Sequence, residues 1–91
     1  MLIRSQNKTI LLNFSNLTVT YIAKGDEGFT ILSLDDENRY RLGKYSSEAK
    51  AMKVLDMIQE AYVEYEAERI YKEGIFEIGT FQMPEDSEVE A

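Results

Sequence analysis

The sequence predicts an α+β domain in which an antiparallel sheet of about five or six short strands is packed by one long helix. Three observations support this fold class. Polar turns divide residues 1–43 into short runs rich in β-branched and aromatic residues, which is typical of strands. Residues 46–73 contain neither glycine nor proline and carry apolar residues at helical spacing. A final strand-like run, residues 75–83, follows the helix.

The first half of the chain divides into five expected strands. They cover residues 2–5, 9–13, 17–23, 29–34 and 39–43. The clearest is 17–23, where odd-numbered and even-numbered residues alternate between the two faces of a strand. A turn follows at residues 24–28, where Gly25 and Gly28 can adopt positive φ angles. Such short connections favour antiparallel neighbours.

The expected helix spans residues 46–73, with Ser46 or Ser47 as its N-cap and Gly74 as its C-cap. Its length is roughly 40 Å at 1.5 Å per residue. A strand of five or six residues covers only about 17–20 Å, so the helix should overhang the sheet. Because the overhang carries apolar side chains, we expect a homo-oligomer, most simply a dimer, to cover it. These side chains are Tyr62, Tyr65, Ile70 and Tyr71.

The C-terminal residues differ in composition from the rest of the chain. After Pro84, four of the remaining residues are acidic. We therefore expect a single domain over residues 1–83 and a flexible acidic tail over residues 84–91.

Composition excludes several kinds of chemistry. The chain has no cysteine and no histidine, which removes disulfides, thiolate nucleophiles, histidine-based triads and the common zinc sites. We expect no enzymatic activity, no metal and no cofactor. The lack of disulfide staples and of a signal-peptide core favours the cytoplasm. A net charge of −7 without a basic stripe argues against direct binding to nucleic acids or to anionic membranes.

An acidic row on the expected helix is the first candidate binding site. Its members are spaced four residues apart, so they should lie on one face, where like charges destabilise a helix by about 0.2–0.5 kcal/mol per pair. A row with this cost can dock a basic protein or mimic nucleic-acid phosphates; the alternative is a solvated face relieved by Lys53 and Lys72. The row consists of Asp56, Glu60, Glu64 and Glu68.

A set of tyrosines and arginines is the second candidate site. Aromatic rings stack on bases and arginine pairs with phosphate, so the set could line a pocket for a nucleotide-like ligand. The alternative is ordinary packing with the hydroxyl groups in contact with water. No glycine-rich phosphate loop accompanies the set. The residues are Arg39, Tyr40, Arg41, Tyr45, Tyr62, Tyr65 and Arg69.

Three segments of the chain carry a resemblance to other proteins. They are residues 1–8, residues 42–62 and residues 81–89. Together they resemble a group of small uncharacterised proteins encoded by phages, prophages and mobile elements of Gram-positive bacteria. The order of strands and helix also looks like small pleckstrin-homology-like domains, in which a helix closes a bent sheet.

The resemblance to phage proteins implies a function by association, because small accessory proteins of phages are often stoichiometric inhibitors of host defences. The leading hypothesis is therefore a non-enzymatic binding protein that antagonises antiviral defence. It would bind a host defence protein or sequester a nucleotide-derived immune signal. The alternative is a structural or assembly accessory of a phage or host complex.

Overall fold

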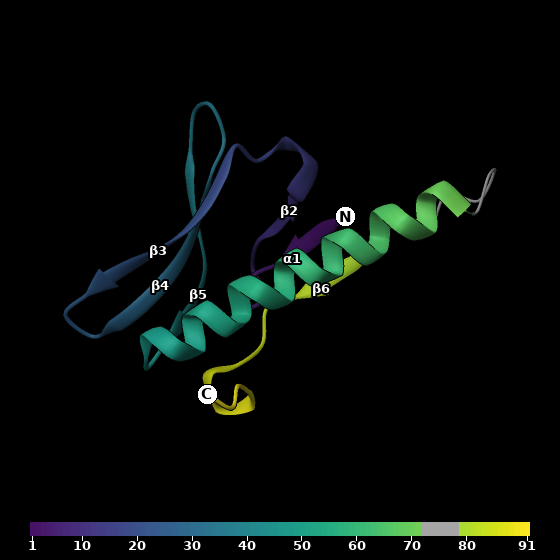
Figure 1. Cartoon of the computed structure of the whole chain (residues 1–91). Coiled ribbons are helices and arrows are strands. Elements are labelled where there is room, and N and C mark those ends of the chain that lie inside the picture. Colours follow the sequence, from purple (N-terminus) through teal and green to yellow (C-terminus); the bar gives the residue numbers. More distant parts are fainter. Residues whose placement is uncertain (72–78) are drawn as a thin grey trace.

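The computed structural model describes the backbone of residues 1–71 and 79–91, and the side chains of residues 1–67 and 79–91. It confirms the α+β class, with strands and one long helix in the predicted order (Figure 1). The elements are β1 (Leu2–Arg4), β2 (Leu11–Asn13), η1 (Phe14–Asn16), β3 (Val19–Gly25), β4 (Gly28–Leu34), β5 (Arg39–Tyr45), α1 (Glu48–Tyr71), β6 (Thr80–Gln82) and η2 (Asp86–Glu88).

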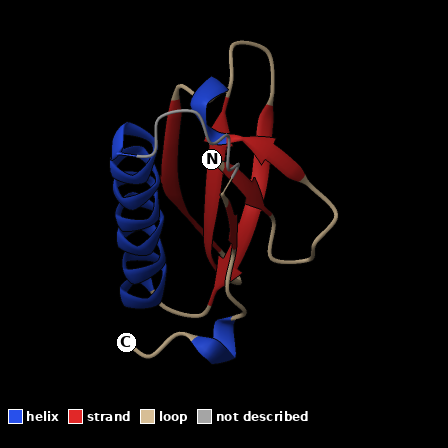
Figure 2. Ribbon diagram, turned by 90° about the vertical axis from the view of Figure 1, so that its right-hand side faces the viewer, coloured by secondary structure: helices blue, strands red, loops and turns tan. Residues whose placement is uncertain are grey.

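The strands form two sheets, whereas the sequence predicted a single antiparallel one. One sheet has the order β3-β4-β5 and is antiparallel throughout. The other has the order β2-β1-β6, in which β1 pairs antiparallel with β2 and parallel with β6. The parallel pair arises because a helical connection brings the chain back beside its own beginning, and short turns do not allow this. The helix lies along one side of the strands (Figure 2).

The hairpin between β3 and β4 depends on a glycine. Gly28 has a φ angle of 137°, and a Cβ atom at this position would lie 2.7 Å from the backbone oxygen of Tyr45. Any other residue would therefore have to move the neighbouring strand β5 as well as adopt an unfavourable φ angle. The predicted turn at residues 24–28 is confirmed, with Asp26 and Glu27 as its two connecting residues.

Helix α1 begins two residues after the predicted start and is described as far as Tyr71, beyond which the predicted span lies outside the described residues. Ser47 is the residue at its N-terminus that acts as the cap, since its Oγ accepts a hydrogen bond of 3.2 Å from the backbone N–H of Lys50. The predicted cap Gly74 lies outside the described residues. Within the described part of the chain, no helix combines the length and apolarity that crossing a bilayer requires.

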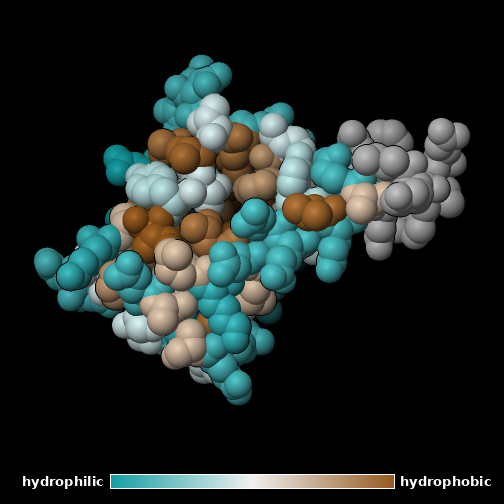
Figure 3. Space-filling view, in the orientation of Figure 1, coloured by the Kyte–Doolittle hydropathy of each residue, from teal (hydrophilic) through white to brown (hydrophobic). Residues whose placement is uncertain are grey.

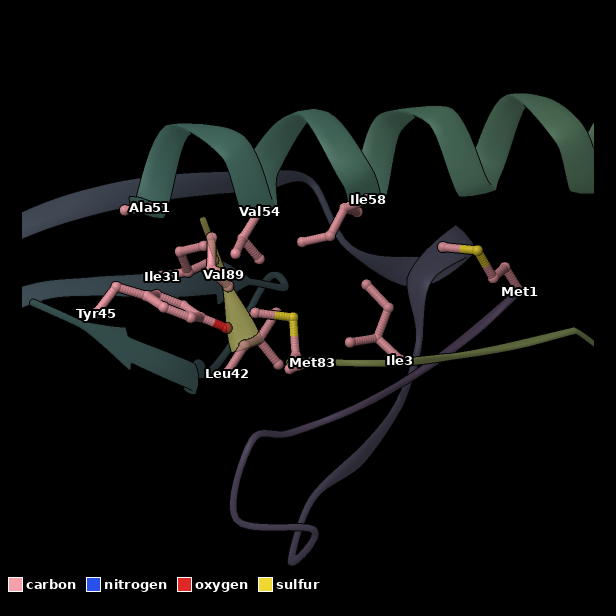
Figure 4. Packing of buried hydrophobic residues seen from close by; sticks show 10 residues of the cluster. All are labelled: Met1, Ile3, Ile31, Leu42, Tyr45, Ala51, Val54, Ile58, Met83 and Val89. Carbon is pink, nitrogen blue, oxygen red and sulfur yellow. The ribbon is translucent and has the colours of Figure 1, made fainter. Parts of the chain in front are cut away.

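The hydrophobic core lies between α1 and the two sheets (Figure 4). The helix contributes three fully buried side chains spaced three and four residues apart, as the predicted apolar stripe requires. Both ends of the described chain also contribute, through Met1 and Val89. The core consists of Met1, Ile3, Ile31, Leu42, Tyr45, Ala51, Val54, Ile58, Met83 and Val89.

The C-terminal segment, residues 84–91, packs against the domain, which corrects the prediction of a separate flexible tail. Val89 is only 5% exposed and belongs to the core. The carboxylate of Asp86 accepts hydrogen bonds from the backbone N–H of Ser46 at 2.8 Å and from its hydroxyl at 3.1 Å. The prediction relied on acidity alone, but a single buried valine and a few specific hydrogen bonds hold the segment in place.

The tyrosines of the expected overhang find partners in the same chain. The ring of Tyr62 meets Phe14 edge-on, with centroids 5.3 Å apart. Tyr65 packs against Gly79, where an added Cβ would lie 3.1 Å from the ring. Ile70 and Tyr71 fall outside the described side chains. The described tyrosines of the overhang are therefore covered by residues of the same chain and do not require a second copy. The homo-oligomer stays a prediction.

Candidate functional site

Three carboxylates of the predicted acidic row lie together on the exposed side of α1. Asp56, Glu60 and Glu64 are all exposed, and with Gln59 and Val63 they line one shallow hollow of the surface. We call these five residues the acidic face. They lie on the opposite side of the helix from the buried stripe, because their positions are offset from it by about half a turn. Glu68 falls outside the described side chains.

None of the three carboxylates has an ion pair or a hydrogen bond within the described residues. The two described salt bridges join Lys44 to Glu27 and Lys50 to Asp86, and neither touches the acidic face. Like charges one helical turn apart destabilise a helix, so this face lowers the stability of α1 slightly. Among the described residues, the acidic face is therefore a charged surface without a counterion.

The nearby helix lysines are engaged by the C-terminal segment instead. Lys53 donates a hydrogen bond to the backbone oxygen of Glu90 at 2.6 Å. Lys50 donates to the backbone oxygen of Asp86 at 3.0 Å, and its Nζ lies 3.5 Å from the carboxylate of the same residue. The sequence suggested that Lys53 would relieve the acidic row. Its ammonium group is oriented toward the C-terminal segment.

Two exposed apolar side chains accompany the carboxylates. Val63 is 60% exposed and lies between Glu60 and Glu64 in the sequence. Met52 is 49% exposed and lies one turn before Asp56. In Figure 3 much of the surface over α1 is hydrophilic. Sequence reasoning missed both, although their spacing from the buried stripe already placed them on the outer face.

The predicted tyrosine–arginine set is not brought together. Tyr45 is 1% exposed and donates a hydrogen bond of 2.8 Å to the backbone oxygen of Pro84, and burial raises its pKa. Tyr40 donates to the carboxylate of Asp35 at 2.9 Å. Among the described cavities, none is lined by more than one member of the set.

The remaining members of the set lie on two different elements. Arg39 and Arg41 are exposed on β5, and Arg41 lines a hollow with Thr30 and Lys44. Tyr62 and Tyr65 lie on α1 and pack on the core. The side chain of Arg69 falls outside the described residues. The described members of the set therefore do not form a single pocket.

In the acidic turn between β4 and β5, the carboxylate of Asp35 stabilises the turn itself. Asp35 accepts hydrogen bonds from the backbone N–H groups of Glu37 and Asn38, at 2.9 and 2.6 Å. These bonds and the hydroxyl of Tyr40 lower the pKa of Asp35. In the described part of the chain, no three acidic, histidine or cysteine side chains are grouped closely enough to hold a metal ion.

Comparison with known proteins gives no assignment. No protein-family model matches the chain, and no curated protein or solved structure is similar to it.

Proposed function

We propose that this chain is a non-enzymatic binding protein that docks a basic surface of a partner protein through the acidic face of α1. One observation carries the proposal. Asp56, Glu60 and Glu64 are exposed at successive helical turns and lack a counterion among the described residues, while Val63 beside them leaves an apolar side chain in water.

The energetics of the helix favour a partner over a purely solvated face. Each like-charge pair costs about 0.2–0.5 kcal/mol, and a basic partner removes this repulsion on binding. Complementary charge also accelerates association and suppresses wrong partners. Val63 and Met52 add apolar area that a partner can bury, which gives affinity that does not depend on salt.

The biological setting of the proposal rests on the resemblance to phage and prophage proteins. The partner would then be a host defence protein in the bacterial cytoplasm, and stoichiometric binding would block it. A nucleotide-derived signal is the less favoured ligand, because the tyrosines and arginines that would hold it are dispersed.

The test compares two variants of equal charge. One carries Asp56→Lys, Glu60→Lys and Glu64→Lys on the acidic face. The control carries Asp26→Lys, Asp36→Lys and Glu37→Lys, three exposed acidic residues in the hairpin turns. Both change the net charge equally. The tagged wild-type chain and both variants are used as baits in a phage-infected Gram-positive host, and bound proteins are quantified by mass spectrometry.

We expect the wild-type chain and the control to retain the same basic protein, with binding that weakens as salt rises, and the acidic-face variant to lose it. In a plaque assay, the wild type and the control should restore the growth of a phage restricted by that protein. Retention of the partner by the acidic-face variant would contradict the proposal. Partners that are virion components would instead support the assembly alternative.

A further inference from the structure

The two sheets have four edge strands, and three of them are short or covered. Strands β2 and β6 are each three residues long. Strand β5 has seven residues, but a register shift opposite Ile31 and Leu32 bends it. Short strands and bulges are the usual means by which proteins prevent pairing at a sheet edge. Strand β3 has seven residues and pairs with β4 in unbroken register, so it has neither protection.

The edge of β5 is also covered by a segment near the N-terminus. The backbone N–H of Gln6 donates to the backbone oxygen of Leu42 at 2.7 Å. The side-chain amide of Gln6 accepts from the N–H of Lys44 at 3.0 Å and donates to its oxygen at 3.1 Å. The side chain of Gln6 therefore pairs with this edge as the backbone of another strand would.

Among the described residues, none covers the outward backbone groups of β3 in this way. Gly25 and Gly28 flank a two-residue turn, so they form a hydrogen-bonded pair. Because hydrogen-bonded pairs alternate along an antiparallel ladder, every second residue of β3 from Gly25 to Val19 bonds to β4. The N–H and C=O groups of Thr20, Ile22 and Lys24 consequently point away from β4. In the described part of the chain, these three residues make no backbone hydrogen bond outside the sheet.

The sequence of β3 is suited to pairing with a second copy of itself. In an antiparallel pair centred on Ile22, Tyr21 lies opposite Ala23 of the second copy, and Thr20 lies opposite Lys24. At the centre Ile22 meets Ile22 of the second copy, on either side a large side chain meets a small one, and no like charges are opposed. In a chain of net charge −7, β3 carries one cation and no carboxylate, so pairing here keeps the acidic surfaces of the two copies apart.

We propose that β3 pairs antiparallel with β3 of a second copy, joining the two β3-β4-β5 sheets into one sheet of six strands. The two-fold axis is perpendicular to the sheet, so both helices lie on the same side of it. The interface uses no residue of the acidic face and is independent of the proposed function. The dimer presents two acidic faces to a partner.

Amide hydrogen exchange of the wild-type protein tests this pairing directly. NMR spectra are recorded at protein concentrations that differ roughly a hundredfold, so that mass action changes the dimer fraction. We expect the amides of Tyr21 and Ala23 to be protected at both concentrations. Those of Thr20, Ile22 and Lys24 should become protected only at the high one. Equal exchange of these three amides at both concentrations, with a monomer mass by light scattering, would overturn the proposal.

A pair of variants at one position provides the second measurement. Lys24→Pro removes an outward N–H group from an exposed residue, and Lys24→Thr removes the charge but keeps the N–H group. We expect Lys24→Pro to raise the dissociation constant of the dimer at least tenfold and Lys24→Thr to leave it within about twofold. Equal dissociation constants for the two folded variants would contradict the pairing. If Lys24→Pro does not fold, the exchange pattern of the wild type decides.

Discussion

Two acidic regions of this chain have opposite structural roles. The C-terminal segment is held by specific contacts: Asp86 binds the start of the helix through Ser46 and Lys50, and Val89 enters the core. The acidic face of α1 has comparable charge but no described intramolecular partner. The difference shows that acidity alone does not separate a structural carboxylate from one available for binding.

The positions of two lysines decide the difference. Lys50 and Lys53 lie on the first turns of α1, where the C-terminal segment passes, and both donate hydrogen bonds to it. Between Lys53 and Ala67, where the side chains of α1 are described, the helix has no further basic residue. Lys53, three residues before Asp56, is within helical reach of the acidic face, but its ammonium group donates to the C-terminal segment.

The largest effect expected from this comparison is that of removing the C-terminal segment. A chain truncated after Met83 loses the burial of Val89, about 1.5–3 kcal/mol, and the acceptor of the buried Tyr45 hydroxyl, about 1–3 kcal/mol. We expect a loss of about 3–5 kcal/mol in the free energy of unfolding, measured by urea denaturation. Wild-type stability in the truncated chain would show that the segment contributes nothing to the fold.

Tyr45→Phe should have the next largest effect. It removes the hydrogen bond to Pro84 while keeping the ring in the core. The Pro84 oxygen keeps its bond to the side-chain amide of Gln6, so we expect a loss of about 0.5–1.5 kcal/mol. The same denaturation experiment measures it. In the wild type, stability should also fall above about pH 10, because burial raises the pKa of Tyr45 in the folded chain.

Acid pH should weaken the contacts of the C-terminal segment. The N–H of Ser46, together with its hydroxyl and Lys50, lowers the pKa of Asp86 in the folded chain. Its contribution to stability is therefore present above the pKa of the unfolded chain, about 3.9, and is lost as pH falls through the lower folded value. Asp86→Asn should make stability less dependent on pH in this acid range.

The smallest effect on stability is expected from neutralising the acidic face. Glu60→Gln removes the repulsion toward Asp56 and Glu64, so we expect a stability gain of about 0.2–0.5 kcal/mol per pair relieved. The gain should shrink in high salt. A loss of more than 1 kcal/mol would instead indicate that Glu60 has a structural partner, and the contrast between the two acidic regions would fail.

Local patterns predicted most of the secondary structure. The alternation in residues 17–23 and the helical spacing after Ser47 correspond to β3 and α1, because both depend on side chains close in sequence. The split into two sheets was not predicted. Nor was the pairing of β6 with β1, which joins segments almost the whole length of the chain apart, because no local pattern specifies that partner.

The candidate site was also predicted only in part, because local spacing relates residues within one element and not residues on different elements. The carboxylates of the acidic face share one helix, so their spacing alone placed them together. The tyrosine–arginine set draws on several elements, and nothing in its spacing specified whether it would converge. Tyr45, its one fully buried member, belongs to the core.

The sequence by itself determined the α+β class, the helix, its buried stripe and the acidic row, since each follows from periodicity within one element. Only the tertiary structure decided which charges are paired. It placed Val89 in the core, brought Asp86 to Ser46, and directed the ammonium group of Lys53 to the C-terminal segment. Long-range contacts of this kind depend on how distant segments pack together, which local residue patterns do not specify.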